Sequence, residues 1–168
     1  MEKQFIDAAR ERRAAFFLLA NHPLKFRLYL LTKLPAAFFS GLRVVKADAE
    51  SCLVSVPYKH FTKNPFRSTY FACLSMAAEL STGLLAMATI YRRQPAVSML
   101  ITGMEAQFHK KATGLTTFSC VEGGRIKDAI EAALQSGEGQ ELKVCSTGKN
   151  EQGETVATFW FTWSFKRK

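Results

Sequence analysis

The stretch YFACLSMAAELSTGLLAMATIY, residues 70–91, decides the fold. Apolar residues occupy nearly every side of the helix that it predicts, and a helix of this kind is surrounded by protein rather than lying on a surface. A polar loop containing Pro65 precedes it, and Ser68 or Thr69 is placed to cap its first turn. We therefore expect this helix at the centre of the molecule.

Strands are predicted on both sides of the helix. Residues 42–50 and 52–58 precede it and are rich in β-branched side chains. After it we predict, in order, strands over 97–110 and 115–121, an amphipathic helix over 125–135, and strands over 141–148 and 155–166. The period of two in the last strand places on one face Ala157, Phe159, Phe161, Trp163 and Phe165. An antiparallel sheet wrapped around one helix, an α+β fold, satisfies this order most economically.

The N-terminal forty residues predict helices. Apolar side chains recur near a helical repeat over residues 4–20, with arginines between them, and Pro23 permits a second helix that ends near Lys33. We expect residues 1–40 to be a basic helical arm packed on a main domain of residues 41–168. Such an arm could rest on an anionic membrane, but covering the sheet or a partner subunit is favoured.

Composition limits the partners and the compartment. The 168 residues carry 23 Lys and Arg against 14 Asp and Glu, and this formal net charge of +9 favours an anionic partner without identifying it. Glu79 interrupts the apolar stretch 71–90, so we expect no membrane span. Acidic residues near the N-terminus oppose a secretory signal, which predicts a cytoplasmic protein. The four widely spaced cysteines predict reduced core thiols, and the histidines have no metal-ligand spacing.

Glu79 is the anomaly of the central helix. Burying a carboxylate costs several kcal/mol unless the group is paired, hydrogen-bonded or protonated. The other residues on its helix face are small, namely Ala72, Ser75, Thr82, Gly83 and Ala86. Either Glu79 is a packed group satisfied by a nearby donor, or it is a general base or nucleophile with a shifted pKa.

Asn64 lies fifteen positions before Glu79, in the loop that leads into the same helix. Backbone amides at the helix start, near residues 70–72, are suited to hold a carbonyl oxygen that becomes negative during acyl transfer. An asparagine in a loop is also typical of turns, where its side chain bonds to the nearby backbone. Both interpretations remain open from the sequence.

Three segments, residues 63–87, 105–126 and 153–168, resemble an uncharacterised family of the hot-dog fold superfamily, related to acyl-CoA thioesterases of the phenylacetyl-CoA type. The resemblance runs from about Gly41 to the C-terminus. It implies a long helix wrapped by a curved antiparallel sheet, here with an N-terminal helical extension. It also implies that two subunits pair edge to edge, as a homodimer or a dimer of dimers, with two sites at the interface.

The resemblance further implies a site. Thioesterases of this type carry an Asn in the loop and an acidic residue on the helix, which Asn64 and Glu79 match, although their acid is more commonly Asp. Their glycine pair at the helix start is replaced here by Phe71 and Ala72. The family's basic residue near the cofactor phosphates is matched by Lys110. The expected substrate contacts are Ser68, Thr69, Phe71, Ala72, Ser75, Lys110, Lys111 and Arg67. Paired lysines at a strand end are also typical of solvated charges.

Two functions are predicted. The first is hydrolysis of an acyl-CoA thioester by Glu79 and Asn64 without a metal, with coenzyme A present only as part of the substrate. The alternative is an acyl or acyl-CoA binding protein without catalysis. A nucleic-acid partner is not expected, because the aromatic residues of the last strand fit a core face.

Overall fold

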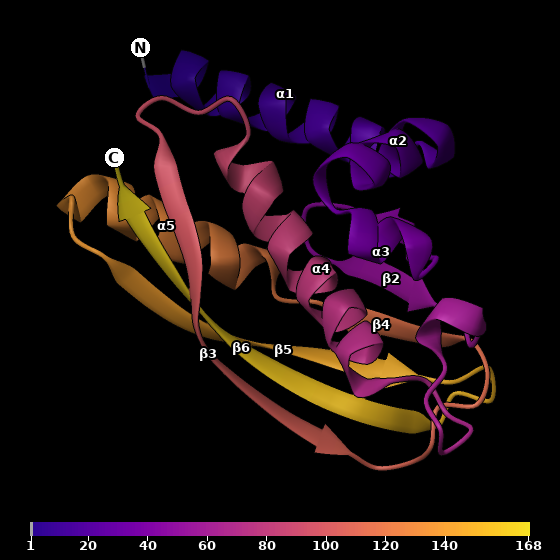
Figure 1. Cartoon of the computed structure of the whole chain (residues 1–168). Helices are drawn as coiled ribbons and strands as arrows, with labels where there is room; N and C mark the ends of the chain where they lie inside the picture. The colour runs from indigo at the N-terminus through magenta and orange to yellow at the C-terminus, as the bar shows by residue number, and fades with distance from the viewer. Residues whose placement is uncertain (1) are drawn as a thin grey trace.

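The computed structural model describes residues 2–168, with the side chains of residues 8–168. Six strands form one antiparallel sheet in the order β1–β2–β4–β5–β6–β3 (Figure 1). They are β1 (Arg43–Ala47), β2 (Cys52–Val56), β3 (Val97–Phe108), β4 (Thr116–Cys120), β5 (Gln140–Lys149) and β6 (Thr155–Arg167). Each of the six strands was expected from the sequence within a few residues. The expected first strand, over 42–50, is the least accurate, because β1 already ends at Ala47.

The central helix α4 (Phe71–Ile90) lies across one face of this sheet and packs against β2, β4, β5 and β6 (Figure 1). Ala77, Ala78, Leu84 and Leu85 have no exposed surface. The predicted helix over residues 70–91 is therefore confirmed, both in its bounds and in its central position. This long helix held by a curved antiparallel sheet is the hot-dog fold.

By length and composition alone, α4 is apolar enough to cross a membrane. Glu79 alone does not prevent this, because the mean hydropathy of the best window is 1.5 despite the single charge, and the absence of a membrane span stays a prediction. However, 67% of that window is buried within the structure. The apolar surface of α4 is thus used in packing, as in the core helix of a globular domain.

The long strand β6 supplies the core surface under the helix. Phe159, Phe161, Trp163 and Phe165 are buried on one face, as the period of two predicts. Phe118 of β4 packs edge-on against Phe159 and lies over Gly148 of β5. A Cβ atom at Gly148 would lie only 2.5 Å from the Phe118 ring, so this close approach requires glycine.

The N-terminal arm consists of α1 (Glu2–Ala20), α2 (Pro23–Lys33) and the short α3 (Pro35–Phe39), which the sequence did not predict. Helix α1 packs against α4, and Phe16, Phe26 and Leu30 join the same hydrophobic core as the sheet. The Asn21 side chain donates to the Ala47 carbonyl at 2.7 Å and accepts from the Ala47 amide at 2.8 Å, which fixes the end of α1 to β1.

Helix α5 (Gly123–Ser136) packs beside α4 and against β5 and β6. It starts directly against the β1–β2 turn, where the Gly123 amide donates to the Glu50 carbonyl at 3.0 Å. A Cβ atom at Gly123 would lie 2.1 Å from the Ala49 carbonyl oxygen, so only glycine permits this contact. The contact fixes α5 against the turn and, through it, against α1.

Candidate active site

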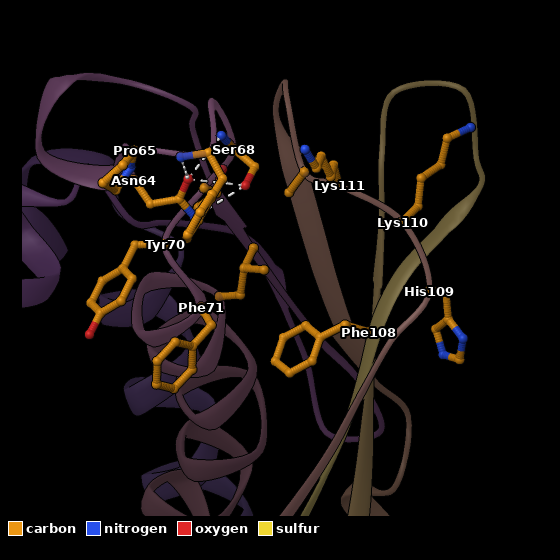
Figure 2. A pocket seen from close by; sticks show the side chains of 13 residues that line it. Asn64, Pro65, Ser68, Tyr70, Phe71, Phe108, His109, Lys110 and Lys111 are labelled. Atoms are coloured by element: carbon orange, nitrogen blue, oxygen red, sulfur yellow. Dashed lines mark hydrogen bonds between the residues drawn. The ribbon is translucent and has the colours of Figure 1, made fainter.

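A pocket of about 580 Å³ opens at the start of α4, between the loop that precedes the helix and the segment that follows β3 (Figure 2). Six of the expected site residues line it, namely Asn64, Ser68, Thr69, Phe71, Lys110 and Lys111. Phe108, His109 and Ala112 also line it and were not expected from the sequence, although the end of the predicted strand over 97–110 pointed to this region. Phe71 on the helix and Phe108 on β3 lie on opposite sides of the pocket, and the Phe108 ring points toward the helix (Figure 2).

The Asn64 side chain is used in the loop itself. Its Oδ1 accepts from the backbone amides of Phe66, at 3.0 Å, and Ser68, at 3.2 Å, and its Nδ2 donates to Ser68 Oγ at 3.1 Å. This geometry lets Arg67 adopt a left-handed backbone with a φ of 59°. Asn64 therefore has the turn role that the sequence left open, and it also lines the pocket.

The start of α4 differs from the expected capping. The N-cap is Tyr70, and no side chain caps the helix, so the expectation that Ser68 or Thr69 would do so is wrong. The reason lies in the backbone: the Thr69 amide donates to the Ala112 carbonyl and the Tyr70 amide to the Thr62 carbonyl, and these bonds fix the entry to the helix. The Phe71 and Ala72 amides have no hydrogen-bond acceptor among the described residues.

The two lysines of the pocket differ in their pairing. Lys110 Nζ bonds to both carboxylate oxygens of Glu154 at 2.7 Å, which lowers the pKa of Glu154. Its side chain projects away from the Asn64 loop, whereas Lys111 lies on the side of the pocket nearer Ser68 (Figure 2). No ion pair is found for Lys111 among the described residues. Lys111, rather than Lys110, is therefore the cation available to a ligand.

Glu79 lies two turns further along α4 and does not line this pocket. Its carboxylate has neither an ion pair nor a hydrogen bond with any described side chain or backbone group. The absence of a side chain at Gly83 leaves room for it, since a Cβ there would lie 3.1 Å from Glu79 Oε1. Burial raises the pKa of Glu79 to about 7. Burial raises the pKa of Tyr29 on α2, and the negative charge of the nearby Glu79 raises it further.

Three further expected residues lie outside the pocket. Ala72 and Ser75 are on the face of α4 that carries Glu79, and Ser75 Oγ lies 3.4 Å from Met104 Sδ on β3. Arg67 is exposed at the tip of the loop. A single chain therefore brings Asn64 to the pocket but does not place Glu79 in the same pocket.

The edge strand β3 runs beside this helix face. Its other neighbour position is empty within the described chain, because β6 is the only strand that pairs with it there. Leu100, Met104 and Phe108 on this strand are 65%, 50% and 54% exposed. An edge of twelve residues with exposed apolar side chains is suited to pairing with another chain.

A family model described as "Domain of unknown function (DUF4442)" matches residues 26–165 of the chain. The match begins within α2, at Phe26, and so before Gly41, where the resemblance noted in the sequence started. No curated protein sequence matches the chain.

Solved structures of low sequence identity share the fold. A protein of unknown function from Pseudomonas aeruginosa, described as a probable thioesterase, has a TM-score of 0.73 and 22% identity, with 87% of this chain and 97% of that chain covered. A thioesterase from Haemophilus influenzae has a TM-score of 0.58 and 15% identity, over 83% and 88%. The PaaI protein of the phenylacetic acid degradation operon of E. coli has a TM-score of 0.58 and 12% identity, over 84% and 89%.

Proposed function

The chain belongs to the DUF4442 family, and from the hot-dog fold that it shares with thioesterases we propose that it hydrolyses the thioester bond of an acyl-CoA. The observation that carries this proposal is Glu79. It is a carboxylate in the middle of the core helix, without a partner among the described residues, and burial raises its pKa to about 7. A base whose pKa lies near the working pH is suited to proton transfer.

Glu79 acts on water in the proposed reaction. Its carboxylate removes a proton from a water molecule as the water oxygen attacks the thioester carbonyl carbon. The tetrahedral oxyanion then collapses, the carbon–sulfur bond breaks, and the proton returns from Glu79 to the leaving thiolate. The products are a carboxylic acid and the thiol of coenzyme A, so the reaction consumes one water and needs no other reactant.

The start of α4 is the proposed oxyanion site. The amides of Phe71 and Ala72 lie at the positive end of a twenty-residue helix, where a developing negative charge is stabilised. Asn64 holds the neighbouring loop through its bonds to Phe66 and Ser68, which fixes the shape of the pocket. Asn64 thus positions the pocket wall, and we propose that the second Nδ2 hydrogen, which the bond to Ser68 does not use, orients the thioester.

The site requires two subunits. The pocket and Glu79 are separated along α4 within one chain, and the exposed edge strand β3 reaches the pocket through Phe108 and the Glu79 face of α4 through the contact of Met104 with Ser75. We propose that β3 pairs with its copy in a homodimer, which extends the sheet and brings the pocket of one subunit to the Glu79 face of the other. Dimers of this kind can pair again into a dimer of dimers.

Lys111 is proposed to contact the phosphates of coenzyme A at the pocket mouth, with Arg67 at the tip of the adjacent loop. Coenzyme A carries several phosphate charges, so these cations favour it over a free fatty acid. Phe71 and Phe108, which are half exposed on the pocket walls, are suited to the acyl group. We also propose a cytoplasmic location, because all four cysteines are unpaired thiols.

A second function, binding of an acyl group or acyl-CoA without hydrolysis, is favoured by one observation. Asn64 already uses both ends of its side-chain amide inside the loop, and a single chain leaves Glu79 away from the pocket. The same fold would then hold the ligand without a carboxylate that reaches its carbonyl.

Replacing Glu79 by glutamine distinguishes the two functions. Gln has nearly the same shape but takes up no proton, so we expect Glu79→Gln to fold and to lose at least about 100-fold in acyl-CoA turnover. The control is Glu138→Gln, at an exposed position between α5 and β5 that lies outside both β3 and the pocket, and it should keep full turnover. A folded Glu79→Gln protein with unchanged turnover removes Glu79 from the reaction, and a wild-type protein that binds but hydrolyses no acyl-CoA of any chain length supports the binding function.

The shared site predicts the mass in solution. We expect sedimentation to give twice the 18.8 kDa chain mass or a higher even multiple. Met104→Lys on the β3 edge should shift the protein toward the monomer and reduce turnover with it. An 18.8 kDa species alone at micromolar concentration would refute the two-subunit site.

A further inference from the structure

A second cavity of about 740 Å³ lies at the other end of α4, between α1 and α5. Thr89 of α4 lines it, whereas Phe71 lines the first pocket, and these residues are roughly 27 Å apart along the helix at about 1.5 Å per residue. The two cavities share no lining residue. The second one therefore takes no part in the proposed hydrolysis and needs an explanation of its own.

Cations dominate the wall of this cavity. Three elements contribute the five lining cations, which are Arg10, Arg12, Arg13, Arg93 and Lys127. The only carboxylate among the lining residues is Glu131, and Arg93 occupies both of its oxygens at 2.6 Å. The remaining four cations are not neutralised within the lining, so the cavity attracts anions.

Arg13 shows most clearly that donors remain unused. Its Nη2 donates to the Ala49 carbonyl at 2.6 Å, which holds the guanidinium against the β1–β2 turn. Its Nε is buried and has no acceptor among the described atoms. Glu50 of the same turn acts on this charge but forms no ion pair with it, and its carboxylate lies instead near the start of α5. Five N–H donors in a planar group suit a phosphate better than a single carbonyl.

The remaining lining residues and the volume of the cavity indicate what kind of ligand it accepts. Gln94 and Gln135 offer amide groups, and Phe17 with three alanines forms an apolar wall. Cavities of about 300–1,000 Å³ accept organic ligands, so this one is much larger than inorganic phosphate requires. We propose that the cavity between α1 and α5 binds an organic phosphate, whose phosphoryl groups contact Arg10, Arg12, Arg13 and Lys127. The phosphoryl group belongs either to a nucleotide-sized metabolite or to a phospholipid headgroup.

Binding of ADP, followed by titration calorimetry, tests the first source. Wild-type protein should bind ADP more weakly as salt rises, since salt screens the phosphate contacts. Arg10→Ala/Lys127→Ala, which changes two exposed positions, should weaken binding by at least about tenfold. Arg43→Ala/Lys149→Ala removes the same charge from exposed sites outside both pockets and should leave ADP binding unchanged.

Cosedimentation with phosphatidylcholine vesicles that contain phosphatidylglycerol tests the second source. Vesicle binding that is lost in Arg10→Ala/Lys127→Ala and kept in Arg43→Ala/Lys149→Ala assigns the phosphoryl group to a lipid. If the double variant does not fold, Lys127→Glu on the exposed side of α5 takes its place in both assays. Neither assay uses thioester hydrolysis, so their results do not depend on the proposed enzyme activity.

Three results would overturn the proposal. The first is that wild-type protein binds neither ADP nor the vesicles. The second is an equal loss in both double variants, which would mean that only the net charge matters. The third is ADP binding that Lys111→Ala abolishes and Arg10→Ala/Lys127→Ala leaves intact, which would place the nucleotide in the first pocket.

Discussion

Neighbouring polar side chains on α4 differ in whether they have a hydrogen-bond partner. Thr82 accepts a hydrogen bond from Trp163 Nε1 at 3.0 Å, and Ser81 bonds to Ser146 of β5 at 2.7 Å, so both hydroxyls join the helix to the sheet. The Glu79 carboxylate, less than one turn away, has no such partner among the described residues. A buried polar group with a partner contributes to folding, whereas a half-buried carboxylate without a partner costs stability and points to chemistry.

The largest expected effect on stability comes from the unpaired group. The pKa of Glu79 is about 7 in the fold against an ordinary 4.5, so the fold prefers the protonated carboxyl. Its contribution to stability is complete below about pH 4.5 and is lost as the pH rises through about 7, a difference of roughly 2 kcal/mol after partial solvent screening. Glu79→Gln does not titrate, so urea unfolding should show it more stable than wild type at about pH 8 and similar to it at about pH 5.

Thr82, whose hydroxyl has a hydrogen-bond partner, provides the matched control. Thr82→Val leaves Trp163 Nε1 buried without its acceptor, which should lower the free energy of unfolding by about 1–3 kcal/mol at either pH. Opposite signs for the two variants at about pH 8 sharpen the comparison. Destabilisation by Glu79→Gln would instead show that the carboxylate has a stabilising partner, and the contrast between Glu79 and Thr82 would then be wrong.

A smaller effect is expected from the same contrast between the two lysines. Lys110 is bound to Glu154, and Lys111 is not paired with any described carboxylate. Lys111→Ala should therefore raise the KM for acyl-CoA several-fold, about 1 kcal/mol, while Lys110→Ala changes it little. A short thioester without the nucleotide should show neither effect. Equal losses on both substrates would give Lys111 a structural role, and a larger loss for Lys110→Ala would restore the assignment made from the sequence.

The sequence predicted those elements whose pattern is set by the core. The central helix and β6 agree with the structure to within about a residue, because a helix that is apolar on all sides and a strand of strict period two have few alternatives. The five-residue helix α3 has too little sequence for a period to be recognised. The cap at Ser68 or Thr69 failed because long-range backbone bonds to Thr62 and Ala112, invisible in a local pattern, fix that loop.

The candidate site was predicted only in part, because a sequence pattern reveals residues that are close along the chain but not those that meet through folding. Asn64, Ser68, Thr69 and Phe71 are close in sequence, and they line one pocket. The pairing of Lys110 with Glu154 depends on the strand order at the far end of the sheet, which the sequence does not specify. The second cavity also combines distant segments, since its cations come from α1, the residues after α4, and α5. A pattern within one stretch of sequence does not show that distant segments meet in space.

The central claim is that the unpaired carboxylate of Glu79 is the base of the reaction, and the pH dependence of kcat/KM for acyl-CoA hydrolysis tests it most directly. Only the ionised carboxylate takes a proton from water, so the rate should be level above pH of about 7 and fall about tenfold per pH unit below it. The residual rate of Glu79→Gln should lack this step. A wild-type rate that stays level down to about pH 5, or the same step in Glu79→Gln, would contradict the assignment.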